Sequence, residues 1–224
     1  YILSRIHPPQ PSTPMNNTEI AKFNMIEQQI RPWEVLDNQV LSVIEQLSRE
    51  DFVDPIYRGL AYADCQIPLA DGVRMLPPTV EGRMLQALLL SSDDQVLEVG
   101  SGSGYISACL AALAGHVTSI DASAGIIERA RANISPLGPD KVEFVQKTLA
   151  QLDAPETYDA IAVTASLPAV PENLKQALKL GGRMFVICGH SPAMEALLIT
   201  RVGAAEWTTQ SLFETDLPRL QTSG

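Results

Sequence analysis

The segment Gln95-Val96-Leu97-Glu98-Val99-Gly100-Ser101-Gly102-Ser103-Gly104-Tyr105 decides the fold of this chain. Valine and leucine give its first half the apolar run of a buried strand, and its glycines let the backbone turn sharply and approach a ligand without a Cβ in the way. A helix that begins after such a turn aims free N–H groups at whatever binds there. The segment therefore predicts a strand, a cofactor-binding turn and the start of a helix.

Two classes of cofactor compete for this turn, and residue spacing separates them. Nicotinamide and flavin folds prefer G-x-G-x-x-G, whereas Gly100, Gly102 and Gly104 run as G-x-G-x-G. The carboxylate of Glu98 would repel a pyrophosphate, but it suits the amino group and sulfonium of S-adenosylmethionine. Further along, Asp121 ends a second predicted strand, where a carboxylate can accept hydrogen bonds from ribose hydroxyls. The pattern favours S-adenosylmethionine over a dinucleotide.

The chain around this segment alternates strands and helices. Strands are predicted at 95–99, 116–120, 141–145, 158–164 and 182–188, and helices at 104–114, 123–136 and 171–179. Such alternation predicts an α/β fold with a parallel sheet, helices on both faces and ligands at the carboxyl ends of the strands. Two further β runs, 195–202 and 206–213, predict a C-terminal antiparallel hairpin. We expect the Gly181-Gly182 pair to separate the last helix from its strand.

The N-terminal part of the chain differs from the rest in pattern. Residues 1–14 are rich in proline without periodicity and are expected to be a tag remnant or another non-native extension. Amphipathic helices are predicted at 18–30, from Asp37 to Leu47 and from Pro77 to about Leu90. We therefore divide a single structural domain into 15–94, with helices and a substrate loop, and 95–224, the cofactor-binding core. The charges of Lys22, Arg31 and Arg49 are expected on solvated faces.

Composition excludes several classes of function. The 224 residues carry 26 acidic against 16 basic side chains, a formal net charge of −10, which argues against nucleic acid as a partner. No apolar run reaches the length of a membrane span. Cys65, Cys109 and Cys188 lie far apart without a C-x-x-C pattern, so we expect reduced thiols, no metal and a cytoplasmic location. The oligomeric state, monomer or homodimer, stays open.

From about Phe23 to Leu220 the chain resembles the protein-L-isoaspartate O-methyltransferase family of class I methyltransferases. The blocks that carry this resemblance are 51–53 with 61–64, 67–72, 96–105, 158–165 and 180–183. The resemblance implies a Rossmann-like fold with a seven-stranded, mostly parallel sheet. It also implies S-adenosylmethionine as methyl donor, S-adenosylhomocysteine as product, and methylation of a carboxylate of isoaspartyl residues in damaged proteins, which is a protein repair activity.

The glycine turn, the strand ends and the resemblance together define candidate site residues. The predicted cofactor contacts are Glu98, Gly100, Ser101, Gly102, Ser103, Gly104, Asp121 and Thr148. The predicted substrate contacts are Met75, Leu76, Thr164 and Ala165. No catalytic residue is assigned, because a carboxylate acceptor is already ionised near neutral pH and requires no general base.

Two departures from the family pattern fall at this site. Leu76 stands where the family has a serine at the substrate carboxylate, and Lys147-Thr148-Leu149 replaces a Gly-Asp-Gly turn on the adenine side of the cofactor. A carboxylate without partners is costly to desolvate, so Arg74, on the same face of an extended segment as Leu76, is a candidate to offset the loss.

Because of these departures, two alternatives stay open. Leu76 would favour a methyltransferase of the same fold with a less polar acceptor, such as a small molecule, in place of a protein or peptide carboxylate. The loss at 147–149 would favour a cofactor-binding scaffold without catalysis.

Overall fold

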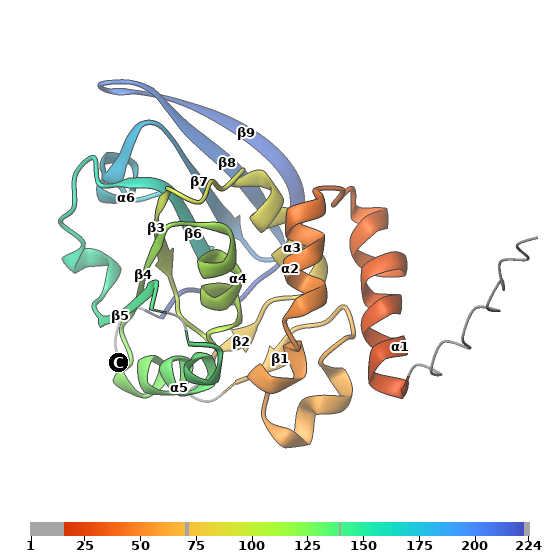
Figure 1. Cartoon of the computed structure of the whole chain (residues 1–224). Coiled ribbons are helices and arrows are strands. Elements are labelled where there is room, and N and C mark those ends of the chain that lie inside the picture. The colour runs from red at the N-terminus through yellow and green to blue at the C-terminus, as the bar shows by residue number, and fades with distance from the viewer. Residues whose placement is uncertain (1–15, 70–71, 139, 222–224) are drawn as a thin grey trace, which may run out of the picture.

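The computed structural model describes residues 16–69, 72–138 and 140–221, so the predicted extension at 1–14 lies outside the described residues. Its centre is a seven-stranded sheet in the order β5-β4-β3-β6-β7-β8-β9 (Figure 1). The strands that pair in parallel are β3 (Gln95–Val99), β4 (His116–Asp121), β5 (Val142–Gln146), β6 (Tyr158–Leu167) and β7 (Leu178–His190). The antiparallel strands β8 (Ala193–Gly203) and β9 (Glu206–Thr215) complete the sheet. The predicted mostly parallel sheet with a C-terminal hairpin is confirmed.

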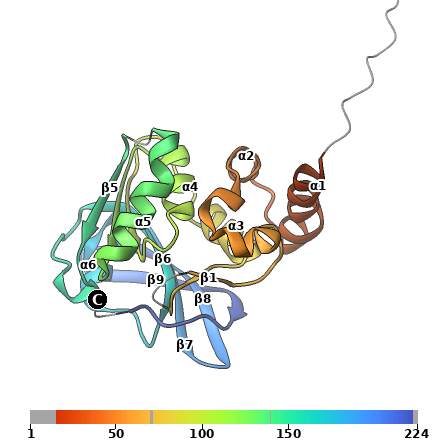
Figure 2. The same cartoon turned by 90° about the horizontal axis from the view of Figure 1, so that it is seen from below.

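Helices cover both faces of this sheet. On one face lie α4 (Tyr105–Leu113) and α5 (Ala124–Ile134), with the N-terminal helices beside them (Figure 2). On the other face, α6 (Glu172–Ala177) packs its buried Leu174 and Ala177 against the sheet. Successive side chains of a strand point to opposite faces, so Val96 of β3 joins the first layer while Leu97 joins the second.

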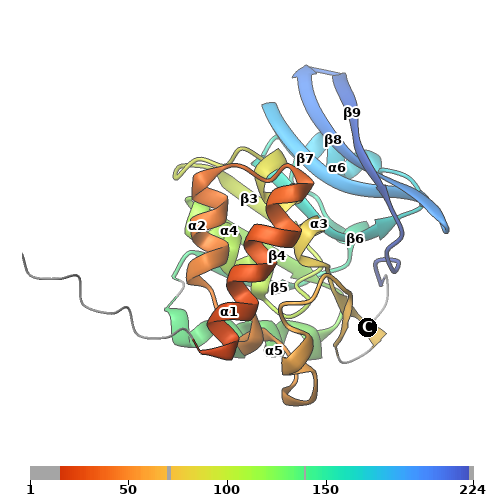
Figure 3. The same ribbon diagram turned by 90° about the vertical axis from the view of Figure 1, so that its right-hand side faces the viewer.

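The N-terminal helices share their core with the sheet. They are α1 (Asn17–Asn24) with a π-helical turn (Met25–Ile30), α2 (Asn38–Gln46) and α3 (Pro78–Ala87). Asp37 begins α2 as predicted, because its side chain accepts from the backbone N–H groups of Gln39 and Val40. Met25 and Met84 belong to the same buried cluster as Phe185 of β7. Figure 3 shows these helices on one side and the β8–β9 hairpin extending away from them. None of the described helices has the length and apolar character needed to cross a membrane.

Two local predictions differ from the structure. The Gly181-Gly182 pair does not separate α6 from β7, because β7 already begins at Leu178, which pairs with Tyr158. Gly181 has φ +80°, and the register between β6 and β7 shifts at this point, so the glycines form an irregularity inside the strand. The predicted loop from residue 67 contains a short hairpin, β1 (Ile67–Pro68) and β2 (Arg74–Met75).

Candidate functional site

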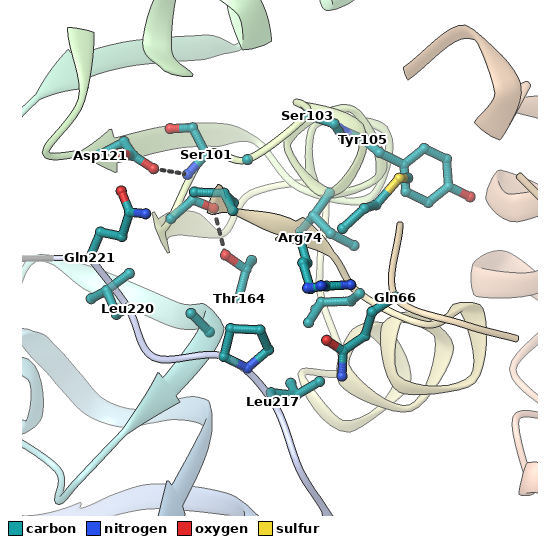
Figure 4. A pocket seen from close by; sticks show the side chains of 18 of the residues that line it. Gln66, Arg74, Ser101, Ser103, Tyr105, Asp121, Thr164, Leu217, Leu220 and Gln221 are labelled. Carbon is teal, nitrogen blue, oxygen red and sulfur yellow. Dashed lines mark hydrogen bonds between the residues drawn. The ribbon is translucent and has the colours of Figure 1, made fainter. Parts of the chain in front are cut away.

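A cavity lies at the carboxyl ends of β3, β4 and β6, where an open parallel sheet binds its ligands (Figure 4). It contains most of the residues predicted for the cofactor and the substrate. The predicted residues that line it are Arg74, Met75, Leu76, Glu98, Gly100, Ser101, Gly102, Ser103, Asp121, Thr164 and Ala165. Gly104 and Thr148 are not among the lining residues.

The glycine turn combines a ligand-facing part with a structural part. Gly100, Gly102 and Gly104 all have positive φ, at +97°, +51° and +83°. A Cβ on Gly104 would lie 2.9 Å from the carbonyl oxygen of Ala130, so this glycine allows α4 and α5 to pack closely. Gly100 and Gly102 line the cavity. A Cβ on Gly100 would lie 2.5 Å from the hydroxyl oxygen of Thr164, whereas a Cβ on Gly102 would meet only a methyl group of Leu69 at 3.8 Å, so it is at Gly102 that the missing Cβ leaves room for a ligand next to the backbone.

Glu98 lines the cavity and has one unsatisfied acceptor atom. Its side chain is fully buried, and Oε2 accepts hydrogen bonds from the hydroxyls of Ser107 and Ser119. Its Oε1 is buried and has no hydrogen-bond partner among the described residues. Burial raises the pKa of this carboxyl to about 8, although both serines favour its ionised form. A ligand that brings a cationic N–H donor would satisfy Oε1 and stabilise the carboxylate.

Asp121 is held at the end of β4 by backbone donors. Its Oδ2 accepts from the N–H of Ser101 at 3.1 Å, and its Oδ1 accepts from the N–H of Ser123 at 3.0 Å. Burial raises the pKa of Asp121, while these hydrogen bonds favour its ionised form. Asp121 lines the cavity, and a carboxylate at the end of a parallel strand suits the two hydroxyls of a ribose.

The second side of the cavity comes from the hairpin β1–β2 and the residues after it. Met75 and Leu76 are buried, while Arg74 is exposed at the surface of β2 and lines the same cavity as Leu76. Figure 4 shows the Arg74 side chain extending along the cavity toward Gln66. Because Leu76 offers only apolar atoms, this wall has no hydroxyl where the family pattern has one.

A buried ion pair lies behind this wall, and sequence reasoning missed it. Arg49 was expected on a solvated face, but it is fully buried: its Nε lies 3.0 Å from Oε2 of Glu81, which lines the cavity. Arg49 also donates to the carbonyl oxygens of Ala61 and Leu76. The expectation was wrong because the partners of Arg49 lie far along the sequence, so no local pattern indicates its burial. The pair fixes the backbone that carries the wall.

The C-terminal segment forms another side of the cavity that the sequence did not indicate. Residues 217–221 return from β9 to the end of β6 and line the cavity. The N–H of Ser166 donates to the carbonyl of Pro218 at 2.9 Å, and the N–H of Leu220 donates to the carbonyl of Ser166 at 3.0 Å. The extension of the family resemblance to Leu220 was the one signal that pointed to this segment.

Three remaining predicted residues have distinct positions. Thr164 donates its hydroxyl to the carbonyl of Gly100 at 2.6 Å, which supports the glycine turn from below. Ala165 follows it along the cavity wall. Thr148 hydrogen-bonds Gln151 with both its N–H and its hydroxyl, outside this wall, so its contact with a cofactor stays a prediction. Among the described residues, no group of His, Cys, Asp and Glu is arranged to hold a metal ion.

Together these residues fit S-adenosylmethionine. The unpartnered Oε1 of Glu98 matches an amino group, the strand-end carboxylate of Asp121 matches a ribose, and the open backbone at Gly102 admits the ligand close to the turn. The fit rests on three separate elements, β3, β4 and the turn between β3 and α4.

Comparison with known proteins identifies a family for this chain. The protein-L-isoaspartate O-methyltransferase of Rhodopseudomonas palustris (strain ATCC BAA-98 / CGA009) is 38% identical over 190 residues, which cover 84% of this chain and 87% of the relative. Protein-L-isoaspartate O-methyltransferase 2 of Pelobacter propionicus is 36% identical over 201 residues, which cover 88% of this chain and 89% of the relative.

A solved structure has the same fold. It is described as a protein-L-isoaspartate O-methyltransferase of Plasmodium falciparum in complex with S-adenosyl-L-homocysteine, and it superposes with a TM-score of 0.77 at 20% identity, covering 93% of this chain and 100% of that one. The family model for protein-L-isoaspartate(D-aspartate) O-methyltransferase matches residues 20–215. With this match and relatives above 30% identity along most of their length, the chain belongs to the protein-L-isoaspartate(D-aspartate) O-methyltransferase family.

Proposed function

We propose that this chain is an S-adenosylmethionine-dependent O-methyltransferase that esterifies the free carboxylate of isoaspartyl residues in damaged proteins. The observation that carries the proposal is the family match over residues 20–215, because it spans both the glycine turn and the wall formed by the hairpin. The buried Oε1 of Glu98 and the carboxylate of Asp121 support the methyl donor.

When bound, S-adenosylmethionine supplies an activated methyl group: an acceptor carboxylate oxygen forms the new O–C bond while the methyl–sulfur bond breaks with its electrons left on sulfur. The chain's own residues position the reactants. Glu98 and Asp121 would hold the donor by its amino group and ribose, and the hydrogen bond from the Thr164 hydroxyl to the carbonyl of Gly100 keeps the glycine turn in place. No side chain has to take a proton, because the acceptor is already ionised. Catalysis therefore depends on orientation in a cavity walled by apolar side chains such as Met75 and Leu76.

One observation favours a second candidate function. Leu76 is 5% exposed and belongs to the hydrophobic core, so the wall that faces the acceptor is more apolar than the family pattern. An acceptor less polar than an isoaspartyl residue would bind such a wall without a desolvation penalty. The same donor site would then serve another small nucleophile.

An acceptor comparison tests both candidates. The protein is incubated with S-adenosylmethionine radiolabelled in the methyl group and either an isoaspartyl peptide, the same peptide with a normal aspartyl residue, or a cell extract. We expect base-labile label in the isoaspartyl peptide and none in its aspartyl twin. Label in the extract with none in the isoaspartyl peptide would support the second candidate. Absence of label in every sample, with S-adenosylhomocysteine bound, would indicate a scaffold without catalysis.

We also propose that the protein works in the cytoplasm, as part of the repair of aged proteins. The free thiols of Cys65, Cys109 and Cys188 support a reducing compartment. The division at residue 94, and the choice between monomer and homodimer, stay predictions.

A further inference from the structure

We infer that Arg74 binds the carboxylate of the methyl acceptor in this chain, in place of the serine whose position Leu76 occupies. The inference rests on the proposed function and sharpens its substrate class. A guanidinium presents a planar fork of N–H donors that matches the two oxygens of a carboxylate, so the acceptor must offer a free carboxylate rather than an amide or a hydroxyl. Arg74 is then the residue that determines acceptor specificity.

The charges around the cavity leave Arg74 available for this role. Among the described residues, the charged side chains that line the cavity belong to Arg74, Glu81, Glu98, Asp121 and Arg219. Glu81 pairs with the buried Arg49, and Arg219 donates to the carbonyl of Gly189. In the described part of the chain no carboxylate pairs with Arg74. Arg219 has no carboxylate partner either, but its guanidinium is held by the carbonyl of Gly189, so Arg74 is the cavity-lining arginine whose guanidinium makes no hydrogen bond to the described residues and can turn to an entering anion.

The cavity is also polarised from one side to the other. Figure 4 shows Asp121 and Ser101 on one side, Arg74 and Gln66 on the other, and Thr164 between them. The side that includes Asp121 and Glu98 suits the positive charge of the methyl donor, and the side that includes Arg74 suits a negative acceptor. This arrangement of charges would bind the donor and the acceptor from opposite sides of one cavity, so that their reacting groups face each other between them.

The backbone under Arg74 is well defined. β1 and β2 pair Pro68 with Arg74 and Ile67 with Met75, so the residue sits on a hairpin rather than in an open loop. Directly after it, the carbonyl of Leu76 accepts a hydrogen bond from the buried guanidinium of Arg49. Because the backbone is anchored on both sides of Arg74, its conformational freedom lies mainly in the side chain. Binding of a carboxylate therefore costs side-chain entropy but little backbone entropy.

The Leu76 wall makes a charged partner necessary. Leu76 and Met75 can cover the methylene groups of an isoaspartyl residue, but they offer no hydrogen bond to its carboxylate. A carboxylate moved from water to such a wall would bind poorly unless a cation or several donors accompany it. Arg74 supplies both from one side chain.

Binding measurements separate this inference from the proposed function. An isoaspartyl peptide and its carboxamide analogue are titrated into the S-adenosylhomocysteine complexes of the wild type, Arg74→Gln, Arg74→Lys and Arg129→Gln. Arg129 is an exposed arginine on α5 that does not line the cavity, so its variant is the matched control. Loss of a charge-assisted hydrogen bond should weaken binding of the isoaspartyl peptide by about 10- to 100-fold in Arg74→Gln, and by less in Arg74→Lys.

In steady-state assays the same loss should appear mainly as a higher KM for the peptide, with a smaller change in kcat. The carboxamide analogue should bind wild type and Arg74→Gln equally weakly. Introducing Leu76→Ser into Arg74→Gln should restore part of the affinity, because the hydroxyl returns a donor to the wall.

Each outcome has a distinct meaning. Equal affinity of wild type and Arg74→Gln for the isoaspartyl peptide overturns the inference, whether or not the peptide is methylated. Weakened binding in Arg74→Gln without methyl transfer by the wild type supports the inference and contradicts the proposed function. Failure of the wild type to bind the peptide overturns both. Unchanged binding of S-adenosylhomocysteine in all variants shows that the fold is intact.

Discussion

Binding of S-adenosylhomocysteine should release a proton from Glu98. This carboxyl is fully buried, its Oε1 has no partner among the described residues, and burial raises its pKa to about 8. At pH 7 about nine in ten of the free molecules therefore carry a protonated Glu98. If the amino group of the ligand meets Oε1, the ionised form becomes the favoured one, and the proton leaves when the ligand binds.

The size of this effect follows from the change in pKa. A rise from the ordinary 4.5 to about 8 corresponds to on the order of 5 kcal/mol in favour of the protonated form. A ligand that binds the ionised form should gain about tenfold in affinity for each unit of pH up to about 8, and then level off.

The free energy of unfolding of the ligand-free protein should show the same cost of ionising Glu98. Because the pKa of Glu98 is raised in the folded state, its contribution to stability is present below pH 4.5 and is lost as the pH rises through about 8. Over that interval the free wild type should lose free energy of unfolding relative to Glu98→Gln, up to on the order of 5 kcal/mol.

Calorimetry measures the proton directly. S-adenosylhomocysteine is titrated at pH 7 into the wild type, Glu98→Gln and Glu128→Gln in two buffers with different enthalpies of ionisation. We expect a difference in heat equivalent to nearly one proton for the wild type and for Glu128→Gln, whose residue is exposed on α5, and almost none for Glu98→Gln. Equal heats in both buffers for the wild type, or an unchanged difference in Glu98→Gln, would show that Glu98 is not the group that releases a proton.

Three further predictions concern the framework of the site. Gly104→Ala should lower the free energy of unfolding in urea by about 2–4 kcal/mol, because it adds a close contact to a strained φ, whereas Gly138→Ala, with φ +62° and open space around it, should cost only about 1 kcal/mol. Equal losses would contradict the packing role. Arg49→Met should cost about 3–5 kcal/mol by leaving Glu81 buried without a cation, and the added change Glu81→Leu should recover most of it; a double variant no better than the single one would argue against the pair. Asp121→Asn should raise the Kd for S-adenosylhomocysteine by about tenfold in calorimetry, and an unchanged Kd would remove Asp121 from the site.

Local sequence patterns predicted the framework of the donor site. The strand at 95–99 has the predicted limits, and the neighbouring helix and strand begin within one residue of their predicted positions. Their signals lie within the segments themselves, as apolar runs, glycines and the acid that ends β4. For the same reason the cavity contains Glu98 and Asp121, which the sequence placed at the ends of adjacent strands.

Features that depend on distant partners were not predictable. Arg49 pairs with Glu81, which lies 32 positions along the chain, and a charged residue in isolation is typical of the surface. Likewise, Pro218 contacts Ser166 across 52 positions of sequence that include the whole β8–β9 hairpin, so no local pattern indicates the contact. Gly104 shows a subtler limit: its positive φ could be inferred from the motif, but its neighbour Ala130 could not, because α5 is positioned by the tertiary fold.

Methylation of isoaspartyl carboxylates by this chain can be measured directly. In the most direct assay, the protein is incubated with S-adenosylmethionine and an equimolar mixture of an isoaspartyl peptide and the same peptide with a normal aspartyl residue. An isotope label in one of the two peptides, away from this residue, distinguishes them by mass. Tandem mass spectrometry then locates any methyl ester. We expect an ester on the isoaspartyl residue and no modification of the aspartyl peptide. Equal methylation of both peptides, or of neither while the donor is consumed on another acceptor, would contradict the proposed function.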